Sequence, residues 1–264
     1  MIYEPKPYKI TEIKQYGNDI KLFRVKTNMN PMPGHFFEVS ILGVGECALA
    51  SCSYNKDYVD ILARNAGGVT NVMFNLKKGE EIFIRGPYGR GYPLNLIKKK
   101  NIILVAGGTG IAPVTSLIEY IEKNRKDFGE IKVFFGFRNP ESILLKDRID
   151  KWKKKFNFTL CFDRAEKKVN GEIGFVHEVI ARKKPGTKNT IAIMCGPEIM
   201  MDASSKILNE LGLENNKIYW NMERRMECAI GNCGRCLIQD VYVCKDGPVF
   251  RYDKIKTKLE NEKS

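Results

Sequence analysis

Long hydrophobic runs are missing from this sequence. The longest uncharged stretch, residues 101–118, is interrupted by three glycines and a proline, so it is too broken to form a membrane-spanning helix. Residues 1–7 have neither the basic region nor the apolar region of a secretory leader. We therefore expect a cytoplasmic protein without a membrane anchor, in a compartment where thiols stay reduced.

Histidine is scarce, and acidic residues are outnumbered. The two histidines, His35 and His177, stand alone in the sequence, and we expect surface or core roles for them rather than catalytic ones. The formal charge is +13, from 44 basic and 31 acidic residues. No stripe of aromatic residues interleaves with the basic ones, which argues against a nucleic-acid partner. We interpret the excess charge first as solvated surface and second as attraction for an acidic protein partner.

Cysteine, by contrast, is clustered. Four of the eight cysteines fall within residues 228–244 with the spacing C-x4-C-x2-C-x7-C, namely Cys228, Cys233, Cys236 and Cys244. Three closely spaced cysteines followed by a distant fourth are typical of a plant-type 2Fe–2S cluster. Gly231 and Gly234 suit a loop that must turn sharply and direct N–H groups at sulfur. Two disulfides or a structural zinc ion are the alternatives. The other four cysteines are scattered, and we expect them to be small apolar fillers.

The first part of the chain has the pattern of an antiparallel sheet. Short alternating runs bounded by turn residues predict strands at 19–26, 36–42, 57–64 and 80–85. Several strands at this spacing favour a small antiparallel β-barrel. We assign residues 1–97 to this domain.

The pattern changes at about residue 98. Residues 102–106 are continuously apolar, as in a strand buried on both faces, and Pro113 suits a first helical position. Further strands are predicted at 131–135, 158–162 and 191–194, with helices near 143–155, 173–182 and 198–211. Strands that alternate with helices predict a doubly wound parallel sheet. We assign residues 98–222 to this α/β domain, 223–250 to the cysteine segment and 251–264 to a polar C-terminal tail.

Three glycine-bearing turns follow strands of the α/β domain. Ligands of open α/β sheets bind beyond the carboxyl ends of the strands, where backbone N–H groups can approach a pyrophosphate. The candidate nucleotide-binding residues are therefore Gly107, Gly108, Thr109, Gly110, Ile111, Ala112, Pro113, Gly136, Arg138, Asp163, Cys195, Gly196, Pro197 and Glu198.

These motifs together resemble the ferredoxin–NAD(P)H reductase superfamily, whose G-G-T-G-x-A-P and C-G-P patterns match residues 107–113 and 195–197. The added cysteine segment resembles that of subunits that pass electrons from flavin to a 2Fe–2S cluster. Residues 223–226 and 242–250 are similar to segments of the anaerobic sulfite reductase B subunits. The electron-transfer subunits of dihydroorotate dehydrogenase and the gamma subunits of cytosolic sulfhydrogenases share the layout.

The flavin motif of the superfamily, R-x-Y-S-x-x-S, is altered here. The aligned stretch is residues 47–53, in which Cys47 replaces the arginine, Leu49 the tyrosine and Ala50 the first serine. Arg64 and the turn after it are the alternative source of charge and N–H donors for the FAD diphosphate. The candidate FAD-binding residues are Leu49, Ala50, Ser51, Ser53, Leu62, Arg64, Gly67, Gly68, Val69 and Thr70.

The resemblance implies electron transfer from NADH or NADPH through FAD to a 2Fe–2S cluster. Asp163 favours NADH because a carboxylate repels a 2′-phosphate, whereas Arg164, Lys167 and Lys168 favour NADPH. The implied partners are a ferredoxin-like iron–sulfur subunit and a sirohaem sulfite reductase subunit. The alternative from another functional class is a nucleic-acid-binding module whose fold is stabilised by a zinc ion or by an iron–sulfur cluster.

Overall fold

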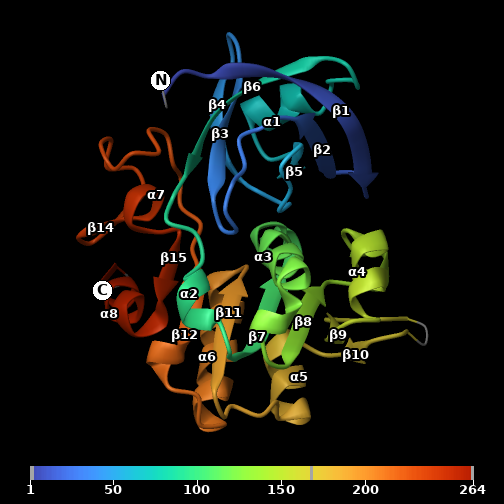
Figure 1. Ribbon diagram of the computed structural model, residues 1–264, viewed down its shortest axis with the longest axis vertical. Helices are drawn as coiled ribbons and strands as arrows, with labels where there is room; N and C mark the ends of the chain where they lie inside the picture. Colours follow the sequence, from blue (N-terminus) through green and yellow to red (C-terminus); the bar gives the residue numbers. More distant parts are fainter. Residues whose placement is uncertain (1–2, 167–168, 263–264) are drawn as a thin grey trace. The chain divides into compact units, whose positions relative to one another are not determined.

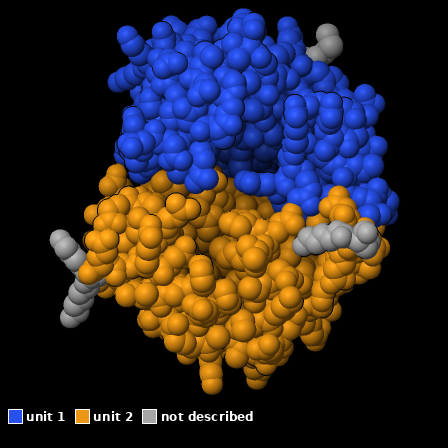
Figure 2. Space-filling model, turned by 180° about the vertical axis from the view of Figure 1, so that it is seen from behind, with its two compact units in different colours: residues 1–92, 115–120, 222–249 blue, residues 93–114, 121–221, 250–264 orange. Residues whose placement is uncertain are grey.

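The computed structural model describes residues 3–166 and 169–262, and the chain folds into two compact units (Figure 2). Unit 1 contains residues 1–92, 115–120 and 222–249, and unit 2 contains residues 93–114, 121–221 and 250–264. The chain thus returns to unit 1 for the cysteine segment after completing most of unit 2.

Unit 1 is built on a six-stranded sheet in the order β4-β3-β6-β1-β2-β5, and its paired strands are antiparallel (Figure 1). A backbone bridge between Ser51 and Ile61 links the two edges of this sheet, as expected for a barrel. The strands are β1 (Lys6–Tyr16), β2 (Ile20–Lys26), β3 (Phe36–Ile41), β4 (Gly45–Ala50), β5 (Tyr58–Arg64) and β6 (Glu81–Tyr88), with the short helix α1 (Gly68–Met73) after β5.

The barrel core follows from the alternation of side chains along each strand. In β3, Phe37 and Val39 point into a cluster of fully buried apolar residues that also includes Phe23 and Ile61. The alternate residues Glu38 and Ser40 therefore point to the opposite face. Both are nevertheless buried, so something else in unit 1 covers that face.

Unit 2 is built on a seven-stranded sheet in the order β10-β9-β8-β7-β11-β12-β15 (Figure 1). The pairs from β10 to β12 are parallel. Its strands are β7 (Asn101–Gly107), β8 (Ile131–Phe137), β9 (Asn157–Phe162), β10 (Glu172–Ile173), β11 (Thr190–Cys195), β12 (Ile218–Asn221) and β15 (Val249–Arg251). The central strands β7 and β11 are buried along nearly their whole length, which explains their continuous apolar sequences.

The helices alternate with these strands, as predicted. They are α2 (Leu94–Ile97), α3 (Ile111–Lys123), α4 (Lys146–Trp152), α5 (Val176–Lys183) and α6 (Glu198–Glu210), with 3-10 turns η1 (Gly108–Gly110), η2 (Arg125–Asp127), η3 (Pro140–Ser142) and η4 (Asn215–Lys217). The predicted antiparallel barrel and parallel α/β sheet are both confirmed. Pro113 is the third residue of α3 rather than the first, because η1 spans the glycines 108–110 and the helix starts directly after them.

The C-terminal region differs from the prediction. Instead of a polar tail, the chain forms helix α8 (Tyr252–Glu262), whose Tyr252, Ile255 and Leu259 are buried. Tyr252 stacks on Trp220 with ring centroids 4.6 Å apart. The apolar residues recur at three- and four-residue intervals among lysines and glutamates, and this helical period was not recognised in the sequence.

Among the described residues, no helix is long and apolar enough to cross a membrane.

Candidate functional site

The cysteine segment belongs to unit 1 and has little regular structure. It contains strands β13 (Leu237–Ile238) and β14 (Val241–Tyr242), which pair with each other, and helix α7 (Val243–Asp246). The remaining backbone is free to turn around a ligand. All four cysteines of the segment are free thiols, so the alternative of two disulfides is wrong.

The four cysteines are in contact as two pairs. The Cys233 N–H donates to the Cys228 Sγ at 3.4 Å, and the Cys244 N–H donates to the Cys236 Sγ at 3.4 Å. Within residues 3–166 and 169–262, no three His, Cys, Asp or Glu side chains gather closely enough to hold a single metal ion.

Backbone N–H groups of the segment point at the sulfurs. The N–H groups of Asn232 and Cys233 donate to the Cys228 Sγ at 3.3 and 3.4 Å, and the Gly231 N–H donates to the Cys244 Sγ at 3.2 Å. Burial raises the pKa of the Cys228 thiol, but the N–H groups of Ile230, Asn232 and Cys233 outweigh burial and lower it to about 6. The loop therefore stabilises negative charge on the Cys228 sulfur, as an iron–sulfur ligand requires, whereas burial raises the pKa of the Cys244 thiol to about 12.

Two glycines make this loop possible. Gly231 and Gly234 have φ values of +74° and +80°, in the left-handed region that other residues enter at a cost. At Gly231 a Cβ atom would lie 2.7 Å from the Lys245 Cδ, whereas at Gly234 it would meet open space. The sequence prediction that both glycines serve the turn agrees with these angles.

In unit 2, two of the predicted nucleotide-binding turns meet. The carboxyl ends of β8, β7 and β11 lie side by side in the sheet, because Cys195 pairs with Ala106 and Gly107 pairs with Gly136. A Cβ atom on Gly110 would lie 2.5 Å from the carbonyl oxygen of Cys195, so the turn at 107–113 packs directly on the turn at 195–198. Only glycine allows this approach of two backbones.

At the end of β9, a carboxylate lies among basic residues. Partial desolvation raises the pKa of Asp163, and the nearby Arg138 and Arg164 guanidinium groups oppose that rise. Asp163 and Arg138 are exposed, and both follow strands whose ends are paired in register. The structure therefore brings these two candidates together, whereas Lys167 and Lys168 lie outside the described residues.

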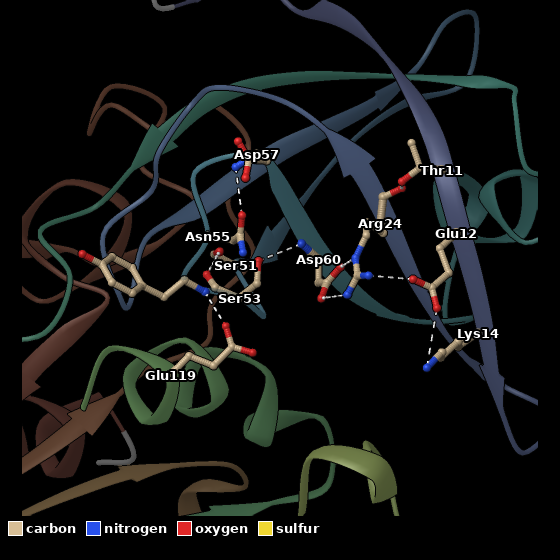
Figure 3. Close-up of polar contacts among 11 residues, drawn as sticks. Thr11, Glu12, Lys14, Arg24, Ser51, Ser53, Asn55, Asp57, Asp60 and Glu119 are labelled. Atoms are coloured by element: carbon tan, nitrogen blue, oxygen red, sulfur yellow. Dashed lines mark hydrogen bonds and ion pairs between the residues drawn. The ribbon is translucent and has the colours of Figure 1, made fainter. Parts of the chain in front are cut away.

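The altered flavin stretch begins on β4 and ends in hydrogen bonds inside the barrel (Figure 3). The Ser53 Oγ accepts from the Asp60 N–H at 2.9 Å, and the Ser51 Oγ donates to the Ser53 carbonyl at 3.0 Å. Both serines are fully buried, so these hydroxyls hold the chain between β4 and β5 together. Leu49 and Ala50 are only half-buried.

The other predicted flavin residues lie at the end of β5, where Leu62 is buried and Arg64 is exposed. The Arg64 Nε is 3.4 Å from the Asp19 Oδ2, and the Thr70 Oγ1 accepts hydrogen bonds from the N–H groups of Ala66 and Gly67. Two of the backbone donors of this turn are thus already bonded within the protein. Gly68 and Val69 begin α1, and Val69 packs near Gly45 of β4.

Sequence reasoning missed one feature of unit 1. An open pocket of about 550 Å³ is lined by residues 46–48 of β4 and residues 224–227 of the cysteine segment. It brings Arg224 and Arg225 next to Cys47, which stands where the superfamily has its flavin arginine. The signal was present in the sequence as two consecutive arginines a few residues before Cys228, but only the fold shows where they lie.

Comparisons with known proteins agree with both halves of the site. Residues 104–206 match the oxidoreductase NAD-binding domain, and residues 223–256 match the iron–sulfur cluster binding domain of dihydroorotate dehydrogenase B. The sulfhydrogenase 2 gamma subunit of Pyrococcus furiosus is 32% identical to this chain, with 95% of this chain and 96% of the relative covered. The chain belongs to the ferredoxin–NAD(P)H reductase-type electron-transfer subunits.

Another relative of this electron-transfer subunit is the probable dihydroorotate dehydrogenase B (NAD(+)) electron transfer subunit of Methanocaldococcus jannaschii, 35% identical over 94% of this chain and 90% of the relative. Among solved structures, an NADH-dependent reduced ferredoxin–NADP oxidoreductase matches with a TM-score of 0.78 at 20% identity, over 96% of this chain and 93% of that one. A Neisseria gonorrhoeae ferredoxin–NADP+ reductase with bound FAD and NADP matches with a TM-score of 0.71 at 20% identity, over 82% and 98%. These structural matches confirm the fold, and family membership confirms an oxidoreductase role.

Proposed function

We propose that this chain passes electrons from NADH through FAD to a 2Fe–2S cluster held by Cys228, Cys233, Cys236 and Cys244. The observation that carries the proposal is the grouping of the cysteines in two contacting pairs, Cys228 with Cys233 and Cys236 with Cys244. A two-iron cluster shares its four ligands between two metal ions, so it needs two pairs of sulfurs. The N–H donors at Gly231, Asn232 and Cys233 would then stabilise the negative charge of the cluster.

A bound flavin would supply the exchange between a two-electron hydride and single electrons. The residues around it must bind its negatively charged diphosphate. We infer that Arg224 or Arg225 supplies the charge that Cys47 does not, because the pocket brings both arginines to β4. Arg64 is the competing candidate. Arg64 also acts on the start of the cysteine segment. Desolvation raises the pKa of the Glu223 carboxyl group, and the positive charge of Arg64 opposes the rise.

For the nucleotide, we propose that the packed turns at 107–113 and 195–198 receive the pyrophosphate of NADH. Gly107 and Gly196 lie at this contact, and the Met200 side chain packs against both, since an added Cβ atom would come within 2.6 Å of its Sδ and 2.8 Å of its Cε. Asp163 would accept a hydrogen bond from the adenosine ribose and disfavour a 2′-phosphate. Stopped-flow reduction of the protein by each donor tests this assignment, and faster reduction by NADPH would contradict it.

For the final acceptor, we propose a sirohaem sulfite reductase subunit reached through a ferredoxin-like iron–sulfur subunit. The support is the similarity of residues 223–226 and 242–250 to the anaerobic sulfite reductase B subunits. The second candidate is a dihydroorotate dehydrogenase or a cytosolic hydrogenase, favoured by the names of the relatives.

Anaerobic co-purification from the native cells separates these acceptors. A sirohaem protein in the complex supports the first, and a dihydroorotate dehydrogenase or hydrogenase subunit supports the second. The isolated chain with NADH should reduce artificial acceptors but not sulfite. Sulfide formed by the isolated chain would refute the proposed division of roles.

A further inference from the structure

One face of the barrel in unit 1 is polar and yet largely buried, since Glu38, Ser40 and Arg85 are buried and only Glu46 is exposed. Strands β3, β4 and β6 place Glu38, Ser40, Glu46 and Arg85 on the same side, because Glu38 is the register partner of Arg85 and Ser40 that of Glu46. The start of the cysteine segment covers this side, as the contacts of Arg85 show. Such a covered face would normally be apolar, since burying an ion pair gains little over packed hydrophobic residues.

Arg85 makes the central contacts on this face. Its side chain is 8% exposed, and its guanidinium donates to the backbone carbonyl of Glu227 at 2.9 Å and to that of Cys228 at 3.1 Å. A forked guanidinium can hold two neighbouring carbonyl groups in a fixed geometry, which a lysine ammonium cannot do in the same way. Arg85 thus holds the first cysteine of the segment on strand β6.

The arginine is itself held from the barrel side. Glu46 of β4 accepts from the Arg85 Nε and Nη2 at 3.0 and 2.8 Å, and the Tyr88 hydroxyl lies 3.0 Å from Nη1. Ser40 donates in turn to Glu46. Three strands therefore fix the guanidinium before it reaches the segment.

We propose that Arg85 is a positioning residue for the iron–sulfur centre, tying the first ligand, Cys228, to the barrel and raising the reduction potential of the cluster. The inference rests on the proposed cluster at the four cysteines. A fixed positive charge close to a ligand favours the more negative, reduced form of the cluster, and charge and hydrogen bonding near the sulfurs are known determinants of potential.

The test uses the full-length holoprotein with four changes. Arg85→Gln removes the charge, Arg85→Lys keeps the charge but loses the fork, and the double variant Arg85→Gln/Glu46→Gln removes both charges together. Arg90→Gln is the matched control, because Arg90 also pairs with the cysteine segment, at 3.3 Å from Asp246, but is largely exposed. Iron and sulfide content, the electron paramagnetic resonance spectrum of the reduced protein and the midpoint potential are measured for each.

We expect Arg85→Gln to lower the midpoint potential and alter the resonance spectrum, and Arg90→Gln to change neither. The midpoint potential of the double variant should lie between those of Arg85→Gln and the wild type. If Arg85→Gln does not fold, the double variant is measured in its place. Arg85→Lys should keep the potential close to that of the wild type but speed proteolysis within residues 223–248. Unchanged potential and spectrum in both Gln variants would overturn the inference. A wild-type protein that takes up no iron–sulfur cluster would instead refute the proposed function.

Discussion

Residues 228–244 and residues 47–53 were both expected to bind a cofactor, but they depend on the rest of the chain to different degrees. In the first stretch, the ligands, the glycines and the N–H donors all come from the same short loop. In the second, the serines are hydrogen-bonded inside the barrel, and the candidate cations for the flavin come from the distant residues 224 and 225. A site whose ligands all lie in one loop needs those residues at their own positions. A site assembled from distant segments can receive a side chain from another segment when one is replaced.

The largest effect is expected from loss of a thiolate in the local site. Replacing Cys233 by Ser should abolish the iron–sulfur absorbance and spare the flavin, because one iron loses a ligand. Cys161→Ser is the control, since that thiol is buried in β9 of unit 2 and burial raises its pKa to about 12. If Cys161→Ser bleaches the protein as fully as Cys233→Ser does, the ligand assignment is wrong.

The buried face of the barrel gives a pH-dependent effect. Neither carboxylate oxygen of Glu38 has a hydrogen-bond partner among the described residues, and burial raises its pKa to about 8, with Arg85 opposing the rise. The folded state therefore prefers the protonated carboxyl group, so the stability that it contributes is complete below pH 4.5 and is lost as the pH rises to about 8. In that window the loss approaches about 1.4 kcal/mol per pH unit.

Glu38→Gln cannot ionise and removes this dependence. The melting temperature of the variant relative to the wild type should rise between pH 5.5 and pH 8, and thermal unfolding followed by circular dichroism measures it. An equal difference at the two pH values would show that Glu38 does not titrate in this range.

The distributed flavin site is tested by comparing its candidate arginines. Arg224→Ala and Arg225→Ala, singly and together, should weaken FAD binding more than Arg64→Ala does. A charge-assisted contact contributes about 1.5–3 kcal/mol, or roughly a ten- to hundredfold change in affinity. FAD retained after gel filtration is measured with the iron–sulfur absorbance as internal reference. Loss of FAD in Arg64→Ala alone would show that the diphosphate binds at the end of β5 rather than beside Arg224 and Arg225.

The smallest effect separates two glycines of the local loop. Gly231→Ala incurs both a left-handed φ and a clash with Lys245, whereas Gly234→Ala incurs only the φ. The φ costs about 1–2 kcal/mol in each case, so Gly231→Ala should lose its cluster at a lower temperature than Gly234→Ala. The loss of visible absorbance on heating gives both midpoints, and the reverse order would contradict the loop geometry.

The sequence by itself determined the features that depend on short-range patterns. Strand alternation predicted most of the barrel, the apolar run at 102–106 predicted a strand buried on both faces, and cysteine spacing predicted the iron–sulfur segment. In each of these cases the physical cause lies within a few residues of the signal. The glycine turns at 107–113 and 195–198 were placed at one edge of the sheet by a general rule of parallel sheets, whose strands align their carboxyl ends.

Tertiary structure alone decided what covers the polar face of β3 and which cations approach β4. Glu38 and Arg85 follow the alternation of surface residues, and only the return of the chain at residue 222 buries them. Helix α8 was likewise missed, because its helical period rests on only three apolar residues, of which Tyr252 packs on Trp220. The periodic patterns of a sequence arise within a single helix or strand. A contact between distant segments, such as that of Arg85 with the Glu227 carbonyl, adds nothing to those patterns, so the sequence alone does not show it.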